Sequence, residues 1–247
     1  MKQSVVPSIK RSGRFFLDSL EEFVFPPFCV LCDEPMPRGT RFLCTPCEKT
    51  LRILSRGRDA CPLCAQNRVE RKCACELAFD QPFTRMFAIF DYDDRCRKLI
   101  HEIKYRGLRN FAFDLGTKFS GEVPPEFLND IDWISAPPLH LFRRMRRGYN
   151  QAEWLAKGFA EGFGMKNRVL ADAVKRGKHT KTQTKLDRAQ RLKNPSGAFM
   201  PNKKRYEILK NSSVLLVDDV VTTGATVAEC TRALLSAGAR EVRVLCL

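Results

Sequence analysis

Residues Val214–Thr226 read VLLVDDVVTTGAT, and this stretch decides the fold. The apolar run Val214–Val217 is typical of a strand buried on both faces of a parallel sheet. Two acids, Asp218 and Asp219, follow it, and a turn rich in Thr and Gly then leads into a helix expected over residues 226–237. A simple strand end with a capping turn explains the Thr and Gly residues. It gives no reason for two adjacent carboxylates, because these repel each other.

This order of strand, acids, turn and helix suits a sugar phosphate. Carboxylates accept hydrogen bonds from ribose hydroxyls, and backbone N–H groups at the positive end of a helix hold a phosphate. Gly224 lets the backbone approach a ligand closely. The site is expected at the carboxyl end of the strand, where open α/β sheets bind ligands. The residues predicted to form it are Asp218, Asp219, Thr222, Thr223, Gly224, Ala225 and Thr226.

Outward from this stretch, apolar runs alternate with helical patterns. We expect strands at residues 86–92, 131–135 and 241–247, and helices at 97–105, 111–119 and 150–163. Asn150 is predicted to cap its helix, with Glu153 reaching back to the cap. Residues 175–193 are polar and basic without apolar periodicity, which predicts a loop. The alternation predicts an α/β domain with a parallel, doubly wound sheet over residues 85–247.

Eight of the eleven cysteines form four close pairs between residues 29 and 75. A C-x2-C pair lets two thiolates bind one ion from a single tight turn, and two pairs complete a tetrahedral zinc site. We expect a small double zinc ribbon over residues 29–78 with two structural zinc ions in sequential pairing; crossed pairing stays open. The expected ligands are Cys29, Cys32, Cys44 and Cys47 for the first ion, and Cys61, Cys64, Cys73 and Cys75 for the second. The other three, Cys96, Cys230 and Cys246, are expected to be small core residues.

The positive charge is concentrated. The net charge is +15, and residues 138–210 hold 19 Lys and Arg against 5 Asp and Glu. This indicates a polyanionic partner, either nucleic acid or a phosphorylated small molecule, although a solvated basic stretch would look the same. No apolar run reaches the ~20 residues that span a bilayer, and no export signal follows the short lead-in helix expected over residues 1–28. The predicted location is therefore the cytoplasm.

At every motif position, Val214–Thr226 resembles the phosphoribosyl-pyrophosphate (PRPP) motif of type I phosphoribosyltransferases. The Cys-rich front, Pro138-Leu139-His140 and the segment RRGYNQA at residues 146–152 extend the likeness. A pattern of Thr180, Gln183, Arg191, Asn194 and Gly197-Ala198-Phe199 completes it. Together these features resemble the competence-associated ComF family from Cys29 onward.

The resemblance implies Mg²⁺-assisted displacement of pyrophosphate from C1′ of PRPP. Asp218 and Asp219 would hold the ribose hydroxyls, and the turn at 222–226 would hold the 5′-phosphate. The loop at 136–140 would bind pyrophosphate, and the basic segment 175–194 would be a mobile lid. The contacts predicted for pyrophosphate or nucleic acid are Pro138, Leu139, Arg143, Arg144, Arg146, Arg147 and Lys104.

Two functions stay open at this point. The first is a phosphoribosyltransferase associated with competence and DNA uptake, acting on an unknown acceptor. The second is a non-catalytic protein that binds single-stranded DNA for transformation or DNA processing and uses the pocket as a ligand site, with competence proteins as partners. No general base follows from the sequence, because His140 and His179 both have the character of ordinary loop histidines.

Overall fold

The computed structural model describes residues 28–37, 42–54, 61, 81–106, 109–177 and 198–247. The chain divides into two compact units, Met1–Leu51 and Arg52–Leu247. The expected lead-in helix, except Phe28, lies outside the described residues. The same holds for His179 and for three of the expected zinc ligands, Cys64, Cys73 and Cys75.

The described residues of the small unit form turns and one short helix, α2 (Thr45–Lys49). Among them Val30, Met36 and Leu43 are buried, each at most 5% exposed. The amide of Asp33 donates to the carbonyl of Cys29 across a tight turn, with the two atoms 2.8 Å apart. Structural zinc bound by the cysteines of this unit would stabilise it, because zinc binding is coupled to folding.

The large unit is organised on a four-stranded sheet in the order β1-β6-β5-β2. The strands are β1 (Arg85–Ala88), β2 (Trp133–Ser135), β5 (Ser213–Val217) and β6 (Glu241–Cys246). Every pairing in this sheet is parallel. The prediction of a parallel α/β sheet is confirmed.

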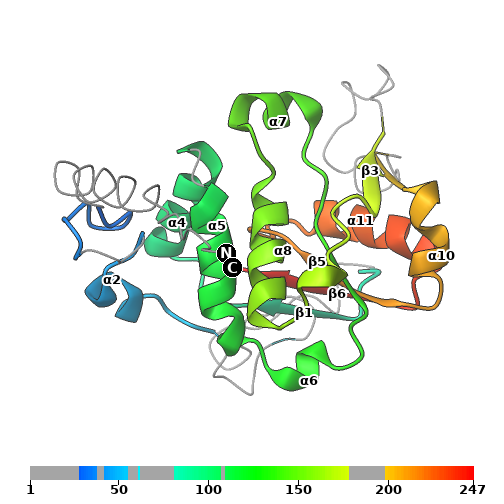
Figure 1. Ribbon diagram of the computed structural model, residues 1–247, viewed down its shortest axis with the longest axis horizontal. Coiled ribbons are helices and arrows are strands. Elements are labelled where there is room, and N and C mark those ends of the chain that lie inside the picture. Colours follow the sequence, from blue (N-terminus) through cyan, green and yellow to red (C-terminus); the bar gives the residue numbers. More distant parts are fainter. Residues whose placement is uncertain (1–27, 38–41, 55–60, 62–80, 107–108, 178–197) are drawn as a thin grey trace, which may run out of the picture. The chain divides into compact units, whose positions relative to one another are not determined.

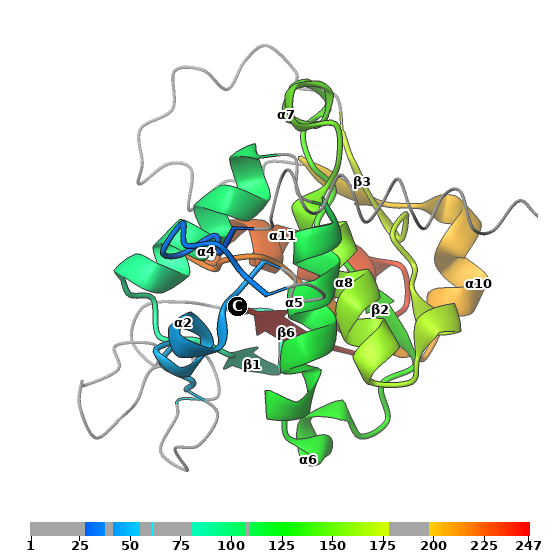
Figure 2. The same ribbon diagram turned by 60° about the vertical axis from the view of Figure 1, so that its left-hand side comes forward.

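Helices cover both faces of the sheet (Figures 1 and 2). The pair α5 (Arg109–Phe119) and α8 (Gln151–Gly162) lies on one face, and α11 (Ala225–Ser236) lies on the other. The remaining helices are α4 (Asp94–Tyr105), α6 (Pro125–Leu128), α7 (Leu141–Arg147) and α10 (Tyr206–Leu209). Short 3-10 turns occupy Ser120–Glu122, Lys166–Arg168 and Lys203–Arg205. All residues of β5 are buried, which explains its unbroken apolar run.

Two glycines let α5 and α8 approach each other closely. A Cβ atom on Gly116 would lie 2.6 Å from the carbonyl oxygen of Leu155. Gly158 faces α5 in the same way, and its carbonyl accepts a hydrogen bond of 3.1 Å from the Thr117 hydroxyl. This helix pair therefore packs backbone against backbone and leaves no room for side chains at these two positions.

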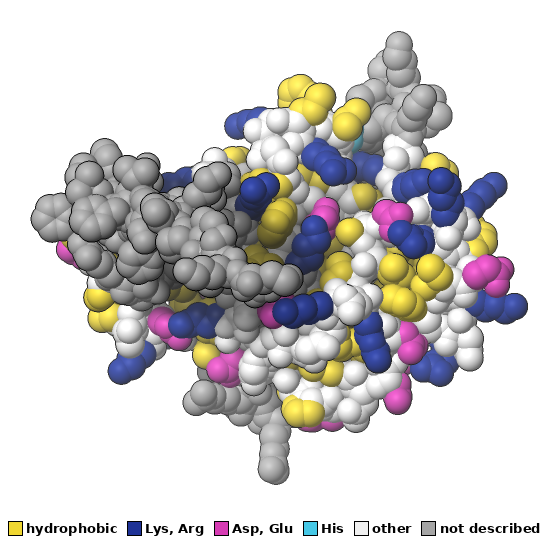
Figure 3. All heavy atoms as spheres, viewed as in Figure 1, with side chains coloured by type: hydrophobic (Ala, Val, Ile, Leu, Met, Phe, Trp, Pro, Cys, Tyr) yellow, Lys and Arg dark blue, Asp and Glu magenta, His cyan; other side chains and the backbone are white. Residues whose placement is uncertain are grey.

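The basic segment before the helix at 150–163, for which no element was expected, forms a helix of its own, α7. It stands apart from the layers of the sheet and its covering helices (Figure 1). Leu141, Phe142 and Met145 are between 66% and 69% exposed. In the space-filling view hydrophobic side chains lie at this tip, and Lys and Arg side chains gather around and below it (Figure 3). The sequence did not reveal α7 because its apolar residues do not face a core.

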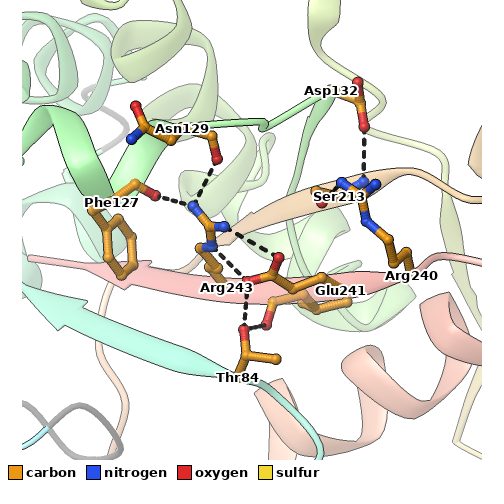
Figure 4. A network of polar contacts seen from close by, with 9 residues as sticks. Thr84, Phe127, Asn129, Asp132, Ser213, Arg240, Glu241 and Arg243 are labelled. Atoms are coloured by element: carbon orange, nitrogen blue, oxygen red, sulfur yellow. Dashed lines mark hydrogen bonds and ion pairs between the residues drawn. The ribbon is translucent and has the colours of Figure 1, made fainter.

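A buried arginine fastens the edge of the sheet at which the strands begin (Figure 4). The Arg243 guanidinium donates to the carbonyl oxygens of Phe127 and Asn129, each at 2.8 Å, and pairs with Glu241 at 2.6 Å. Glu241 also accepts a hydrogen bond of 2.8 Å from the Thr84 hydroxyl. Hydrogen bonding to Arg243 lowers the pKa of the Glu241 carboxyl. This network joins β6 to the end of α6 and to the chain before β1.

Two local predictions were wrong. Lys175 and Arg176 lie in a strand, β3 (Val174–Arg176), which pairs antiparallel with β4 (Phe199–Pro201). This cross-strand pairing, which periodicity cannot reveal, overrides the polar character of the segment. The rest of the expected lid, residues 178–194, lies outside the described residues.

The expected capping box of α8 does not form. Asn150 occupies the N-cap position, but its side chain donates to the carbonyl of Pro137 at 3.0 Å. Glu153 pairs with Lys157 one turn later, at 2.7 Å. The Asn150 side chain thus ties the start of α8 to the loop after β2.

Candidate functional site

A cavity of about 500 Å³ lies at the edge of the sheet where the strands end. Because β2 and β5 are parallel neighbours, the loop after Ser135 and the acids after Val217 come to the same edge. Nine of the residues singled out in the sequence line the cavity: Lys104, Pro138, Leu139, Arg143, Arg146, Arg147, Asp218, Asp219 and Thr226. Residues more than a hundred positions apart therefore meet in one site.

The two acids lie side by side at the end of β5. The backbone amide of Asp219 donates to Oδ1 of Asp218 at 2.8 Å. Asp219 is only 3% exposed, and its Oδ2 lies 3.1 Å from Nζ of Lys104. Burial, and then the negative charge of Asp219, raise the pKa of the Asp218 carboxyl to about 8. A ligand that donates hydroxyl groups, or brings a cation, would stabilise the charged pair.

The turn after the acids is shaped by one glycine. Gly224 has φ = 73° and forms the N-cap of α11. A Cβ atom there would also lie 3.2 Å from Nε2 of Gln81. Glycine is therefore favoured both by the positive φ and by the close contact. The Thr223 hydroxyl accepts a weak hydrogen bond of 3.4 Å from the amide of Ala225. Thr222 and Thr223 are exposed, and of the turn only Thr226 lines the cavity.

Arginines from α7 form part of the cavity wall. Arg143, Arg146 and Arg147 lie three and four positions apart, on one helix face, and line the cavity. Arg144 is not among the lining residues, so its expected contact with pyrophosphate or nucleic acid stays a prediction. The Arg147 guanidinium lies 5.2 Å from the centre of the Tyr105 ring. No ion pair involves any of these arginines in the described part of the chain, so the wall attracts anions.

No histidine of the described residues lines the cavity. Nδ1 of His140 accepts a hydrogen bond of 3.2 Å from the amide of Phe142 and thereby caps α7. This agrees with its interpretation as an ordinary loop histidine.

Four cysteines of the small unit form a separate cluster. The Sγ atoms of Cys29, Cys32, Cys44 and Cys47 all lie within 4.8 Å of one another. Those of Cys32 and Cys44 are 3.8 Å apart, close to the spacing of about 3.8 Å that four Zn–S bonds of ~2.3 Å impose. The amide of Cys44 also donates to Sγ of Cys29 at 3.4 Å. The donor set and its size therefore fit a zinc ion with the sequential set of ligands.

Comparison with known proteins places the chain in a family. The model of the phosphoribosyl transferase domain matches residues 145–247. The DNA utilization protein YhgH of Escherichia coli K12 is 31% identical over 229 residues, which is 90% of this chain and 96% of that protein. This chain belongs to the ComF family. Competence protein F of Haemophilus influenzae is also 31% identical, covering 87% of this chain and 94% of that protein. The competence protein ComFC of Streptococcus pneumoniae is 26% identical over 89% and 98% of the two chains.

Solved structures similar to this ComF chain include two enzymes. One is described as the allosteric regulatory enzyme of purine biosynthesis, and the other as the glutamine PRPP amidotransferase from B. subtilis with ADP and GMP. Each is 18% identical and covers 60% of this chain and 30% of its own, with TM-scores of 0.40 and 0.42. The parallel sheet and the phosphoribosyl transferase match identify the fold without these structures.

The lining of the ComF cavity also includes Tyr105, Pro137, Asn150, Gln151, Ala152, Arg176 and Val220. Pro137 belongs to the loop expected to bind pyrophosphate, and Asn150, Gln151, Ala152 and Val220 belong to the motifs quoted above, whereas Tyr105 was not expected. Arg176 belongs to the segment expected to be a lid, and its fixed place in the wall could not be predicted because no strand was expected there. Tyr149 of the RRGYNQA segment is buried, and its hydroxyl donates to the carbonyl of Ile103. Burial raises its pKa to about 12, so Tyr149 is a core residue.

The three cysteines expected in the core of the ComF chain are there. Cys96, Cys230 and Cys246 are each at most 4% exposed. No described helix is both long and apolar enough to cross a membrane. The cytoplasmic location stays a prediction.

Proposed function

We propose that this chain binds PRPP in the cavity at the carboxyl edge of the sheet and transfers its phosphoribosyl group to an acceptor during the handling of DNA. One observation carries the proposal: a pair of acids and three arginines of α7 line a single cavity of about 500 Å³. PRPP has the matching chemistry, because its ribose hydroxyls are donors and its phosphates are anions.

In this proposal Asp218 and Asp219 accept hydrogen bonds from the ribose hydroxyls. The turn at 222–226 holds the 5′-phosphate, and the loop at 136–140 with Arg143, Arg146 and Arg147 holds the pyrophosphate. The acceptor attacks C1′ of the ribose, the bond from C1′ to the pyrophosphate oxygen breaks, and pyrophosphate leaves with the bonding electrons. The positive charge of the arginines would stabilise the negative charge that develops on this leaving group.

A magnesium ion fits this site, because carboxylate and phosphate oxygens are the ligands it prefers. The raised pKa of Asp218 shows how poorly the acid pair tolerates two negative charges without further cations. When bound, the ion would neutralise pyrophosphate oxygens and so make pyrophosphate a better leaving group. Asp218 and Asp219 are the residues that would hold it, directly or through water.

Zinc in the small unit has a structural role in this proposal. The described cluster offers four thiolates and no open position for a substrate, which is the pattern of a structural site. The second set of ligands, Cys61 with Cys64, Cys73 and Cys75, remains a prediction.

Thermal unfolding tests the binding proposal. A ligand that binds only the folded chain at 100 times its Kd adds about 2.7 kcal/mol to the free energy of unfolding. PRPP with Mg²⁺ should therefore raise the melting temperature by several degrees. The variant Asp218→Asn with Asp219→Asn should lose this response, and Glu207→Gln on α10 should keep it. A wild-type melting temperature that PRPP does not change would contradict the proposal.

A second candidate function is binding of single-stranded DNA. The relatives include a DNA utilization protein and two competence proteins, and α7 supports the idea in this chain. Phe142 is 66% exposed and lies among arginines, so it offers a base-stacking surface next to phosphate-binding groups. The arginines would serve both candidate functions, whereas Phe142 would serve only this one.

The dependence of DNA affinity on salt concentration tests this second candidate. Affinity for single-stranded DNA should fall steeply with salt, and replacing Arg146 by Ala should reduce the slope of log K against log salt by about 1. Phe142→Ala should weaken DNA binding by about tenfold and leave PRPP binding intact, since one stacked base contributes about 1–3 kcal/mol. DNA binding that ignores both salt and these variants would remove this candidate.

A further inference from the structure

Gln151 is the first residue of α8 and one of the residues that line the cavity. It is only 6% exposed, and its Oε1 atom has no hydrogen-bond partner in the described part of the chain. A buried carbonyl oxygen without a partner costs free energy, because in the unfolded chain it accepts hydrogen bonds from water. This oxygen only accepts, so the group that completes it is an N–H or O–H donor. A fully ionised phosphate has no such donor and would leave Oε1 unpaired.

The start of α8 offers donors beside this acceptor. The Asn150 side chain donates to the carbonyl of Pro137 and does not cap the helix. The amide of Trp154 donates to the carbonyl of Asn150, and the amides before it lie in the first turn, where a helix has no carbonyl to offer them. Ala152, in this turn, also lines the cavity. The end of α8 therefore suits a ligand that carries a donor and an acceptor on one edge.

Tyr105, the last residue of α4, adds an aromatic surface to the cavity lining. The centre of its ring lies 4.7 Å from that of the His101 ring and 5.2 Å from the Arg147 guanidinium. These contacts leave Tyr105 54% exposed. An exposed aromatic ring in a cavity wall favours a flat, aromatic ligand group that stacks on it.

A hydrogen bond joins the two helix ends that carry these residues. The hydroxyl of the buried Tyr149 donates to the carbonyl of Ile103 and so ties the start of α8 to the last turn of α4. Gln151 and Tyr105 each lie two residues after one partner of this bond. The amide and the aromatic ring are therefore held relative to each other before a ligand binds, which lowers the entropic cost of binding.

Nucleobases have the chemistry that these groups require. Each is a flat aromatic ring with N–H donors and acceptors on its edge, and proteins recognise unpaired bases by stacking them on aromatic side chains and hydrogen bonding to that edge. We propose that Tyr105 and Gln151 hold a nucleobase, and that this base is the acceptor of the phosphoribosyl group. This inference rests on the proposed function. Gln151 accepts from an N–H that the base keeps, so it determines specificity and takes no proton.

Ligand-observed NMR of the full chain with Mg²⁺ tests this inference, since it detects weak binding of small molecules. The probes are adenine, hypoxanthine, uracil and caffeine, because caffeine has a purine ring without any N–H donor. The wild-type chain should bind at least one of the first three more tightly than caffeine. Gln151→Leu should weaken that base about tenfold, the value of one hydrogen bond, and change caffeine by less than about threefold. Gln151→Glu, which keeps an acceptor oxygen, should retain most of the affinity.

Variants of Tyr105 test the stacking surface. Tyr105→Leu should weaken caffeine and the favoured base alike, by about tenfold, and Tyr105→Phe should bind both as the wild type does. Tyr92→Leu is the matched control, because Tyr92 is 57% exposed and is not among the residues that line the cavity. A loss in the control as large as that in Tyr105→Leu would overturn the stacking role.

The stability of the free chain separates recognition of a ligand from a structural role of Gln151. Gln151→Leu removes an unpaired buried oxygen, so the variant should unfold at the same urea concentration as the wild type or at a higher one. Unfolding at a clearly lower concentration would show that the amide stabilises the folded chain, and would overturn the inference.

A short single-stranded oligonucleotide, compared with an abasic strand of the same length, identifies the source of the base. A preference for the strand with bases that Gln151→Leu removes would support a base presented by DNA, even if no free base binds. A wild-type chain that binds PRPP but neither a free base nor a base in a strand in a Gln151-dependent way would overturn this inference and leave the proposed function intact. Binding of a base that depends on Gln151, in a chain that does not bind PRPP, would preserve the base site and end the proposed function.

Discussion

Lys104 forms an ion pair with one of the two acids in the cavity. Asp219 is buried, and the ammonium group 3.1 Å away is the cation that neutralises it in the free chain. The sequence indicated that Lys104 belongs to the same pocket, but as a contact for an anion. Only the fold shows that its nearest charged partner is a carboxylate.

Lys104→Met should therefore destabilise the free chain. Removal of the ammonium leaves the buried Asp219 charge without its cation, and we expect a loss of about 1–3 kcal/mol in the free energy of unfolding at pH 7. Chemical denaturation measures this loss. Lys203→Met, at an exposed position, is the control. Equal stability of the two variants would show that the ion pair contributes nothing.

Asp218 should make stability depend on pH. Its pKa is raised from 3.8 to about 8 on folding, so the folded chain favours the protonated form. The contribution of this group is then fully present below about pH 4 and is lost as pH rises toward 8. Asp218→Asn should flatten the fall in stability between pH 6 and 8.5 and make the free chain more stable at pH 8, by on the order of 1 kcal/mol. An unchanged pH profile would mean that Asp218 is charged throughout.

At the scale of elements, long apolar strands and amphipathic helices were predictable, and short elements held by tertiary contacts were not. The strand β5 can be recognised from its run of apolar residues, because helices cover both faces of the sheet and bury every residue of this strand. The strand β3 exists through its pairing with Phe199 and Met200, and α7 has no core-facing stripe. Arg176 was hidden for this reason: its place in the site depends on a hairpin that periodicity does not indicate.

The close packing of α5 on α8 gives a test at this scale. Gly116→Ala would place a methyl group 2.6 Å from the Leu155 carbonyl, and the rigid backbone leaves it no room. We expect a loss of about 2–3 kcal/mol, the usual result of overpacking. Gly121→Ala is the matched control, because a Cβ atom there meets no atom within 4 Å. If the two variants have the same melting temperature, the two helices can move apart to accommodate the methyl group.

At the scale of the whole molecule, the two ends of the parallel strands have different roles, one structural and one in the candidate site. The Arg243 network fastens the edge where strands begin, and the cavity lies where they end. The acids, the turn and the α7 arginines of the candidate site were predictable because each adjoins a recognisable motif. Their meeting in one cavity, together with Lys104 and Arg176, follows from the parallel order of the strands and could not be derived from spacing.

Metal analysis tests the organisation of the small unit. Two zinc ions per chain are expected from the eight cysteines, and Cys32→Ser should remove one of them. The variant should also be more easily unfolded by chelators, since binding of structural zinc is coupled to folding. A ratio near one ion per wild-type chain would refute the two-site assignment.

The central claim is that the acids and arginines of one cavity bind PRPP, and direct titration tests it most simply. Calorimetry of the full chain with PRPP and Mg²⁺ should show one site per chain, with affinity reduced at least about 100-fold when Asp218 and Asp219 are both replaced by Asn. Absence of binding to the wild-type chain, or undiminished binding to the double variant, would contradict the account.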